Sequence, residues 1–169
     1  MTAAAQPIAM TDTNESQANA LVKRYMYWAA GFGLIPAPGL DILLIGGAQV
    51  NLLRQMSHIY QIEFHENRGK SIISALVGGL GTPVVAFGSI GSALKMIPLI
   101  GPIFGAVAMP AVAAATTYAI GRVFIQHFES GGTFLDFEPE KVKEYFKEQY
   151  AEGRKAVDEV IGSKKTVKV

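Results

Sequence analysis

The polar side chains from residue 58 to residue 66 come closest, by type, to a metal site. Imidazole and carboxylate groups, which zinc takes as ligands in proteins, come from His58, Glu63, His65 and Glu66. The histidines lack the i,i+4 spacing of an H-E-x-x-H helix, and no third ligand is evident. Because the chain has no cysteine, thiolate zinc sites, iron–sulfur clusters and thiol nucleophiles are excluded. We therefore expect no metal and no cofactor.

Two glycine-containing motifs fall short of nucleotide-binding patterns. Gly69-Lys70-Ser71 matches the end of a phosphate loop, but Phe64 stands where the G-x-x-x-x-G-K-[ST] pattern requires glycine. The run Gly78-Gly79-Leu80-Gly81 lacks the spacing of a dinucleotide fingerprint and lies in an apolar stretch. Nearby serines have no accompanying histidine or aspartate that would make a nucleophile. The sequence therefore predicts a protein that is not an enzyme.

Charged side chains are almost absent from the middle of the chain. From Ser71 to Gly121 the only one is Lys95, which separates the uncharged runs 71–94 and 96–121. A helix needs about 20 apolar residues to cross the hydrocarbon core of a bilayer, and each run is longer than that. The chain is also 50% hydrophobic and only 17% charged, with a mean hydropathy of +0.26. These features favour a membrane-associated protein with two spans.

A turn is expected between the two runs. Prolines and a glycine follow Lys95, and this composition predicts a turn near Lys95 to Pro102, with the lysine at the level of the lipid headgroups. The fold class predicted is all-α, with an integral membrane helical hairpin over residues 68–128 and flanking amphipathic helices. A buried hairpin within a soluble helical bundle is the alternative.

Small residues recur at helical spacing inside both runs, as expected for helices that approach closely in lipid. They are Gly88 with Ser92, Gly101 with Gly105, and the series Ala111, Ala115 and Ala119. Such faces join either the two helices of the hairpin or neighbouring subunits of a homo-oligomer.

A proline-rich turn precedes the second of two expected N-terminal helices. Residues 1–19 are polar and are expected to be disordered, although the first helix begins near Ser16. Pro36, Pro38 and Gly39 interrupt the helical pattern, and Asp41 is interpreted as the N-cap of a helix over residues 42–60. Alternatively, Asp41 is a buried carboxylate, which in a membrane would be a functional candidate.

Aromatic residues lie beside basic ones near the end of the first helix. Tyr25, Tyr27 and Trp28 follow Lys23 and Arg24, a composition preferred at membrane interfaces but also found in ordinary cores. The region 16–60 thus forms either a helical collar at the base of the hairpin or a re-entrant or interfacial helix pair.

The C-terminal region, residues 129–169, is expected to be an amphipathic helix with a basic tail. The helix runs from Pro139 to Ile161, and Gly162 ends it before a tail of three lysines. One apolar face, a candidate partner surface, includes Tyr145, Phe146 and Tyr150. The helical membrane domain before it covers residues 20–128.

The proline-glycine-aspartate motif and the apolar hairpin together resemble a known family. The run Leu34 to Asp41, a helix ending in Ile59-Tyr60, and Arg68 to Gly79 opening a Gly-rich hairpin are similar to the bacterial YcjF-like inner-membrane proteins, whose function is unknown. Related domains occur after small GTPase domains or beside separate GTPase-like proteins. The resemblance implies a membrane anchor or output module, with a separate GTPase-like cytoplasmic partner because this chain has no GTPase domain. It supplies no catalytic residues.

The distribution of basic residues predicts an orientation. All of them except Lys95 lie outside residues 71–121, so the positive-inside rule places both termini in the cytoplasm and the hairpin in the bacterial inner membrane. A net charge of +1 gives no footprint for nucleic acid. The function expected is a non-enzymatic scaffold or anchor that oligomerises and recruits a partner. The alternatives are a pore-forming, transport or membrane-remodelling element, and a soluble bundle that binds an apolar ligand.

Overall fold

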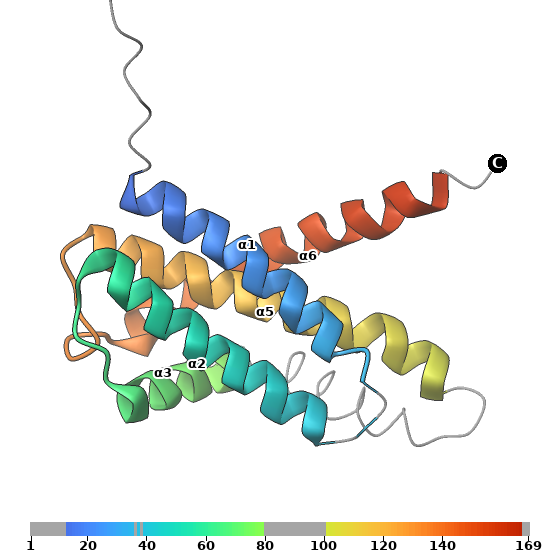
Figure 1. The fold of residues 1–169 in the computed structure, drawn as a ribbon, viewed down its shortest axis with the longest axis horizontal. Coiled ribbons are helices and arrows are strands. Elements are labelled where there is room, and N and C mark those ends of the chain that lie inside the picture. The colour runs from blue at the N-terminus through green and yellow to red at the C-terminus, as the bar shows by residue number, and fades with distance from the viewer. Residues whose placement is uncertain (1–12, 36, 38, 80–100, 167–169) are drawn as a thin grey trace, which may run out of the picture.

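The computed structural model describes residues 13–35, 37, 39–79 and 101–166, and every regular element in these ranges is helical (Figure 1). The all-α prediction is therefore confirmed. The elements are α1 (Asn14–Phe32), α2 (Leu40–Tyr60), α3 (Glu66–Gly79), α5 (Gly101–Glu129), the short 3₁₀ helix η1 (Pro139–Val142) and α6 (Lys143–Thr166).

Helix α5 lies at the centre of the bundle. Its most extensive contacts are with α1 on one side and α6 on another, while α2 packs beside α1 and α3 beside α2 (Figure 1). Helices α3 and α5, the described parts of the expected hairpin, touch each other at only a few residues. In the described part of the chain, the main neighbours of α5 are thus the two flanking amphipathic helices.

Small residues on α5 explain its choice of neighbours. A Cβ atom at Gly121 would overlap both methyl groups of Val22 on α1, and one at Gly153 of α6 would lie 3.0 Å from the Cα of Ala115. Ala111, Ala115 and Ala119 are all buried. The alanine series that suggested contacts across a hairpin or between subunits is used instead for close packing of α5 within the chain.

An aromatic cluster lies at the end of the core where α5 has its C-terminus. The rings of Phe124 and Phe137 stack with centroids 4.6 Å apart, and Phe128 and Phe134 meet Phe124 at 5.4 Å. Arg68 of α3 donates hydrogen bonds of 3.2 Å to the backbone carbonyls of Phe134 and Phe137. The cluster therefore holds the connection between α5 and η1 against α3.

Three boundaries differ from the sequence-based expectation. Helix α1 begins at Asn14, because the Thr13 hydroxyl accepts a hydrogen bond of 3.2 Å from the Ser16 amide as an N-cap, so residue 19 falls inside the helix. Gly101 starts α5, so the end of the expected turn is already helical. Gly162 does not end α6, which reaches Thr166, because a single glycine costs a helix only about 1 kcal/mol.

Crossing the hydrocarbon core of a bilayer sets a minimum length and hydropathy for a helix. Within residues 13–79 and 101–166, apart from the undescribed positions 36 and 38, no helix is both long enough and apolar enough to cross a membrane. Pro36, Pro38, Gly88, Ser92 and Lys95, which the sequence marked as candidates, lie outside the described residues.

The close packing at Gly121 predicts that Gly121→Ala destabilises the protein by about 1–3 kcal/mol, because the β-branched side chain of Val22 cannot turn away from the added methyl group. Gly47→Ala is the matched control. An added Cβ there has no atom within 4 Å, so the change is expected to stabilise α2 by up to about 1 kcal/mol. Urea denaturation of both variants measures the difference, and equal effects would contradict the packing argument.

Candidate functional site

Large apolar side chains are exposed mainly where α1 ends and α2 begins. Leu43 is 73% exposed and Leu34 59% exposed, although hydrophobic residues of this size usually lie in the core. We call this surface the apolar end, and it comprises Tyr27, Trp28, Leu34, Leu40, Ile42 and Leu43. Clustered exposed apolar residues of this kind mark an interaction surface.

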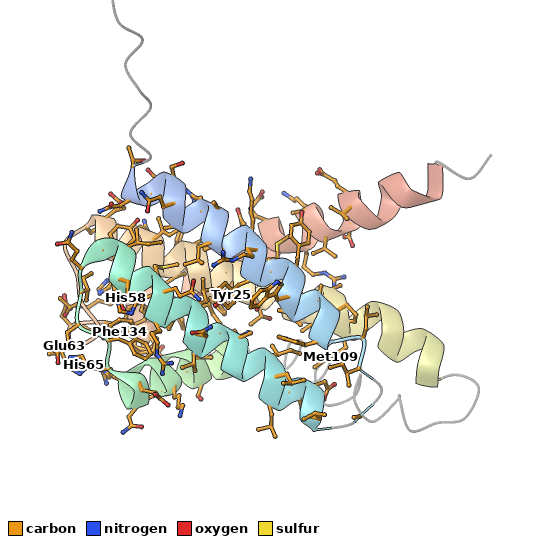
Figure 2. The ribbon with its side chains drawn as sticks, viewed as in Figure 1. Tyr25, His58, Glu63, His65, Met109 and Phe134 are labelled. Atoms are coloured by element: carbon orange, nitrogen blue, oxygen red, sulfur yellow. The ribbon has the colours of Figure 1, made fainter. Side chains whose placement is uncertain are left out.

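Helix α5 reaches the same end of the bundle. Gly33 packs so closely on α5 that an added Cβ would lie 2.8 Å from the Pro110 backbone. Met109, beside Pro110, is buried in one cluster with Ala29 of α1 and Ile45 of α2. Figure 2 shows Met109 far from His58, Glu63 and His65.

Asp41 is the only charged side chain between Tyr25 and Leu53, and it is fully buried. Its Oδ1 atom accepts backbone hydrogen bonds from Gly39, at 3.1 Å, and from Ile42, at 2.9 Å. A buried carboxylate is tolerated when donors of this kind surround it. The single acid of this segment is therefore withdrawn from the surface, and the apolar end exposes no charge from α1 or α2.

The prediction that Asp41 is the N-cap of the helix is wrong by two residues. Helix α2 begins at Leu40, so Asp41 is its second residue and Gly39 is the cap, with a φ of +91° that favours glycine. The carboxylate still accepts amide hydrogen bonds at the start of a helix, where its negative charge is favourable. Its burial agrees with the alternative reading of the sequence.

Basic residues mark where the uncharged segments of the helices end. We call Arg24, Arg54, Lys70 and Arg122 the basic belt, with one residue each from α1, α2, α3 and α5. Each of the four helices continues from its belt residue toward the apolar end. In these described segments the only charged side chain is that of Asp41, which is buried. The described segments of all four helices between the basic belt and the apolar end therefore expose no charged side chain.

Hydrogen bonds and ion pairs connect the belt residues to neighbouring helices. Arg24 donates to the Oε1 atom of Gln55 at 2.9 Å, and Arg122 donates to Oδ1 of Asn19 at 2.5 Å. Arg54 and Lys70 both contact Glu66, at 2.8 and 2.7 Å. The hydrogen bond and positive charge of Lys70, reinforced by Arg54, lower the pKa of Glu66, so this carboxylate stays ionised beside its two cations.

Helix α6 limits how far the apolar surface extends along the bundle. Its Val157 packs against Met26 of α1 and Ala111 and Ala114 of α5, on the apolar side of the belt. The outer face of α6 remains charged there, with Lys155 bonded to Glu152 at 2.9 Å. On the side that α6 covers, the uncharged surface is therefore confined to the end of the bundle.

The aromatic residues predicted as a partner surface on α6 instead face the core. Phe146 is 1% exposed, and Tyr145 and Tyr150 pack partly buried against the same core cluster. Burial raises the pKa of Tyr150 above its ordinary value. Gly101 and Gly105 lie in the first two turns of α5.

The opposite end of the bundle is polar. His58, Glu63 and His65 lie there (Figure 2), with 4.0 Å between His65 Nε2 and Glu63 Oε2. The described residues contain no group of three histidine, cysteine, aspartate or glutamate side chains placed to hold a metal ion. Tyr60, at the C-terminus of α2, donates a hydrogen bond of 2.6 Å to Glu129. Burial, and secondly the Glu129 carboxylate, raise the pKa of Tyr60 above its ordinary value.

Polar contacts that the sequence did not reveal attach α2 to its neighbours. The Tyr25 hydroxyl accepts hydrogen bonds from Asn51, at 2.7 Å, and Gln55, at 2.6 Å. Gln49 donates to the hydroxyl of Thr117 on α5 at 3.2 Å, and both residues are buried. These contacts fix α2, and thus the exposed apolar residues of its first turn, relative to α1 and α5.

This fold defines the class as an all-α bundle with one uncharged end. A family model described as a domain of unknown function, DUF697, matches residues 4–155, and the chain belongs to this family. It is similar to Magnetosome membrane protein 22 of Magnetospirillum gryphiswaldense, with 33% identity over 154 residues, covering 88% of this chain and 76% of that protein. No solved structure matches. The resemblance to a family of unknown function with membrane proteins among its members is confirmed.

The burial of Asp41 predicts that Asp41→Ala lowers the free energy of unfolding by about 1–3 kcal/mol, because the partly buried hydrogen bonds from the Gly39 and Ile42 amides lose their acceptor. Asp41→Asn is expected to cost less, since its carbonyl oxygen can still accept. Thermal denaturation compares both variants with Asp158→Ala, an exposed acid on α6 whose loss should change stability by less than about 0.5 kcal/mol. Identical stabilities for Asp41→Ala and Asp158→Ala would refute the assigned role.

Proposed function

We propose that this protein is a non-enzymatic scaffold or anchor that associates with a membrane through its apolar end. The observation that carries the proposal is that the described residues of α1 and α2 expose no charge there, because Asp41 is buried. The relative named as a magnetosome membrane protein supports membrane association.

The exposed side chains suit an interface between water and lipid. Trp28 and Tyr27, 51% and 54% exposed, are the residue types preferred at the headgroup level. Leu43 and Ile42 extend further toward the end, and each leucine or isoleucine moved from water into hydrocarbon contributes about 1.5–3 kcal/mol. The basic belt follows on the water side, where each lysine or arginine near anionic lipid contributes about 1 kcal/mol.

The segment that enters the bilayer is shorter than hydropathy alone indicates. Residues 109–121, expected to belong to a span, are packed between α1 and α6, and most of their side chains are buried by protein. This part of the expected hairpin is therefore covered by protein, and residues 80–100, whose only charged residue is Lys95, lie outside the described residues.

The remaining parts of the proposal concern topology and partners. The basic residues outside 71–121 support a location at the bacterial inner membrane with both termini in the cytoplasm. The polar end and the charged face of α6 would then face the cytoplasm and offer surfaces to a GTPase-like partner, as the family resemblance implies. Homo-oligomerisation, if present, uses surfaces other than the alanine series of α5, which is occupied within the chain.

Flotation of the purified protein with phosphatidylcholine vesicles tests the role of the apolar end. Leu43→Glu is expected to lower vesicle affinity at least about tenfold, because it removes the burial of a leucine and adds a charge. Leu135→Glu is the matched control: Leu135 is 67% exposed, comparable with Leu43, but lies in the loop before η1 at the opposite end.

The control variant should float as the original protein does. Equal losses for Leu43→Glu and Leu135→Glu, or unchanged binding for both, would contradict membrane association through the apolar end. Thermal denaturation of each variant confirms that the bundle remains folded.

A further inference from the structure

A groove of about 590 Å³ runs along the surface between α2 and α3. It starts at the apolar end, at Ile42 and Leu43, and ends at the basic belt, at Arg54 and Lys70. The groove is therefore apolar at one end and positively charged at the other.

The middle of the groove is open because its floor lacks side chains. A Cβ atom added at Gly46 or Gly47 would have no atom within 4 Å. Val50 and Ile73 line the groove beside these glycines, and the polar lining residues Asn51 and Ser74 donate hydrogen bonds within the chain, to Tyr25 and to the Lys70 carbonyl. A flexible hydrocarbon chain fits such a surface, which offers it apolar contacts.

The basic end carries more positive than negative charge. Arg54 and Lys70 share a single carboxylate, that of Glu66, which leaves one positive charge uncompensated. Arg54 also lies over the ring of Phe64, with 5.2 Å from its guanidinium carbon to the ring centroid, so its planar group is oriented. An oriented guanidinium beside an ammonium group is suited to bind a phosphate.

The length of the groove matches one leaflet of a bilayer. Twelve helical steps from Ile42 to Arg54 rise roughly 18 Å along α2, and half of a hydrocarbon core is about 15 Å thick. We propose that this groove binds one anionic phospholipid, with its phosphate at Arg54 and Lys70 and an acyl chain over Gly46 and Gly47. The proposal rests on the proposed function, because the groove opens at the apolar end.

Filling the groove tests the proposal without altering charge. Gly47→Leu should remove the preference of the full-length protein for vesicles containing phosphatidylglycerol over vesicles of phosphatidylcholine alone. It should also reduce the phospholipid that remains with the detergent-purified protein, measured by mass spectrometry of a lipid extract. Gly31→Leu, an equally open glycine of α1 outside the groove, is the control and should leave both quantities unchanged.

A second pair of variants tests the charged end. Lys70→Gln should lower affinity for the phosphatidylglycerol vesicles about fivefold, the contribution of one cation near an anionic surface. Lys155→Gln is matched because Lys155 is also exposed and bonded to one glutamate, but it lies on α6. Lys155→Gln should not lower this affinity. Equal losses of affinity for the two variants would show that the preference for phosphatidylglycerol is non-specific electrostatic attraction, which would overturn the proposal.

The outcomes separate this proposal from the proposed function. If the original protein binds phosphatidylcholine vesicles but Gly47→Leu keeps its phosphatidylglycerol preference and its retained lipid, the groove proposal is wrong and membrane association stands. If Gly47→Leu instead dissociates a dimer in analytical ultracentrifugation and leaves lipid binding intact, the groove holds a second copy of the chain, which also overturns the lipid proposal.

Discussion

The arrangement of the bundle depends on covering α5. This helix is apolar around most of its circumference, so in water it must be enclosed, and its small residues determine which helices can approach. Gly121 admits Val22 of α1, and Ala115 admits Gly153 of α6, so the flanking amphipathic helices enclose it from two sides. The most hydrophobic described helix is consequently an internal element of the protein.

Once α5 is covered, most of the exposed large apolar side chains among the described residues lie where the covering helices α1 and α2 end and begin. Helix α1 ends at Phe32 and α2 begins at Leu40. The exposed Leu34 lies between the two helices, and the exposed Leu40, Ile42 and Leu43 lie in the first turn of α2. An ionised carboxylate on this surface would oppose contact with lipid. The two backbone amides that bind Asp41 allow the carboxylate to be buried, so the same local geometry that starts α2 also keeps the apolar end free of charge.

The sequence predicted the helices well and their environment less well. Amphipathic periodicity and the proline-rich break located α1, α2 and α6 to within a few residues, and Pro139 marks the start of η1 as expected. Hydropathy could not show that residues 109–121 are buried by protein, because an all-apolar helix suits a protein core as well as a bilayer. Likewise, the residues of the basic belt and their partners are far apart in the sequence, as in the hydrogen bond from Arg122 to Asn19, and only the tertiary fold brings them together.

The position of α6 sets the depth at which this bundle can meet a membrane. Val157 attaches α6 beside Met26 and Ala111, and the outer face of the helix carries charges that must remain hydrated. On the side that α6 covers, hydrocarbon can therefore reach no further along the bundle than this contact. In the proposed arrangement, Tyr27 and Trp28 then lie at the headgroup level, and the basic belt follows on the water side within reach of the lipid phosphates. In the proposed arrangement, a shallow seat of this kind would leave both the polar end and α6 accessible to a partner.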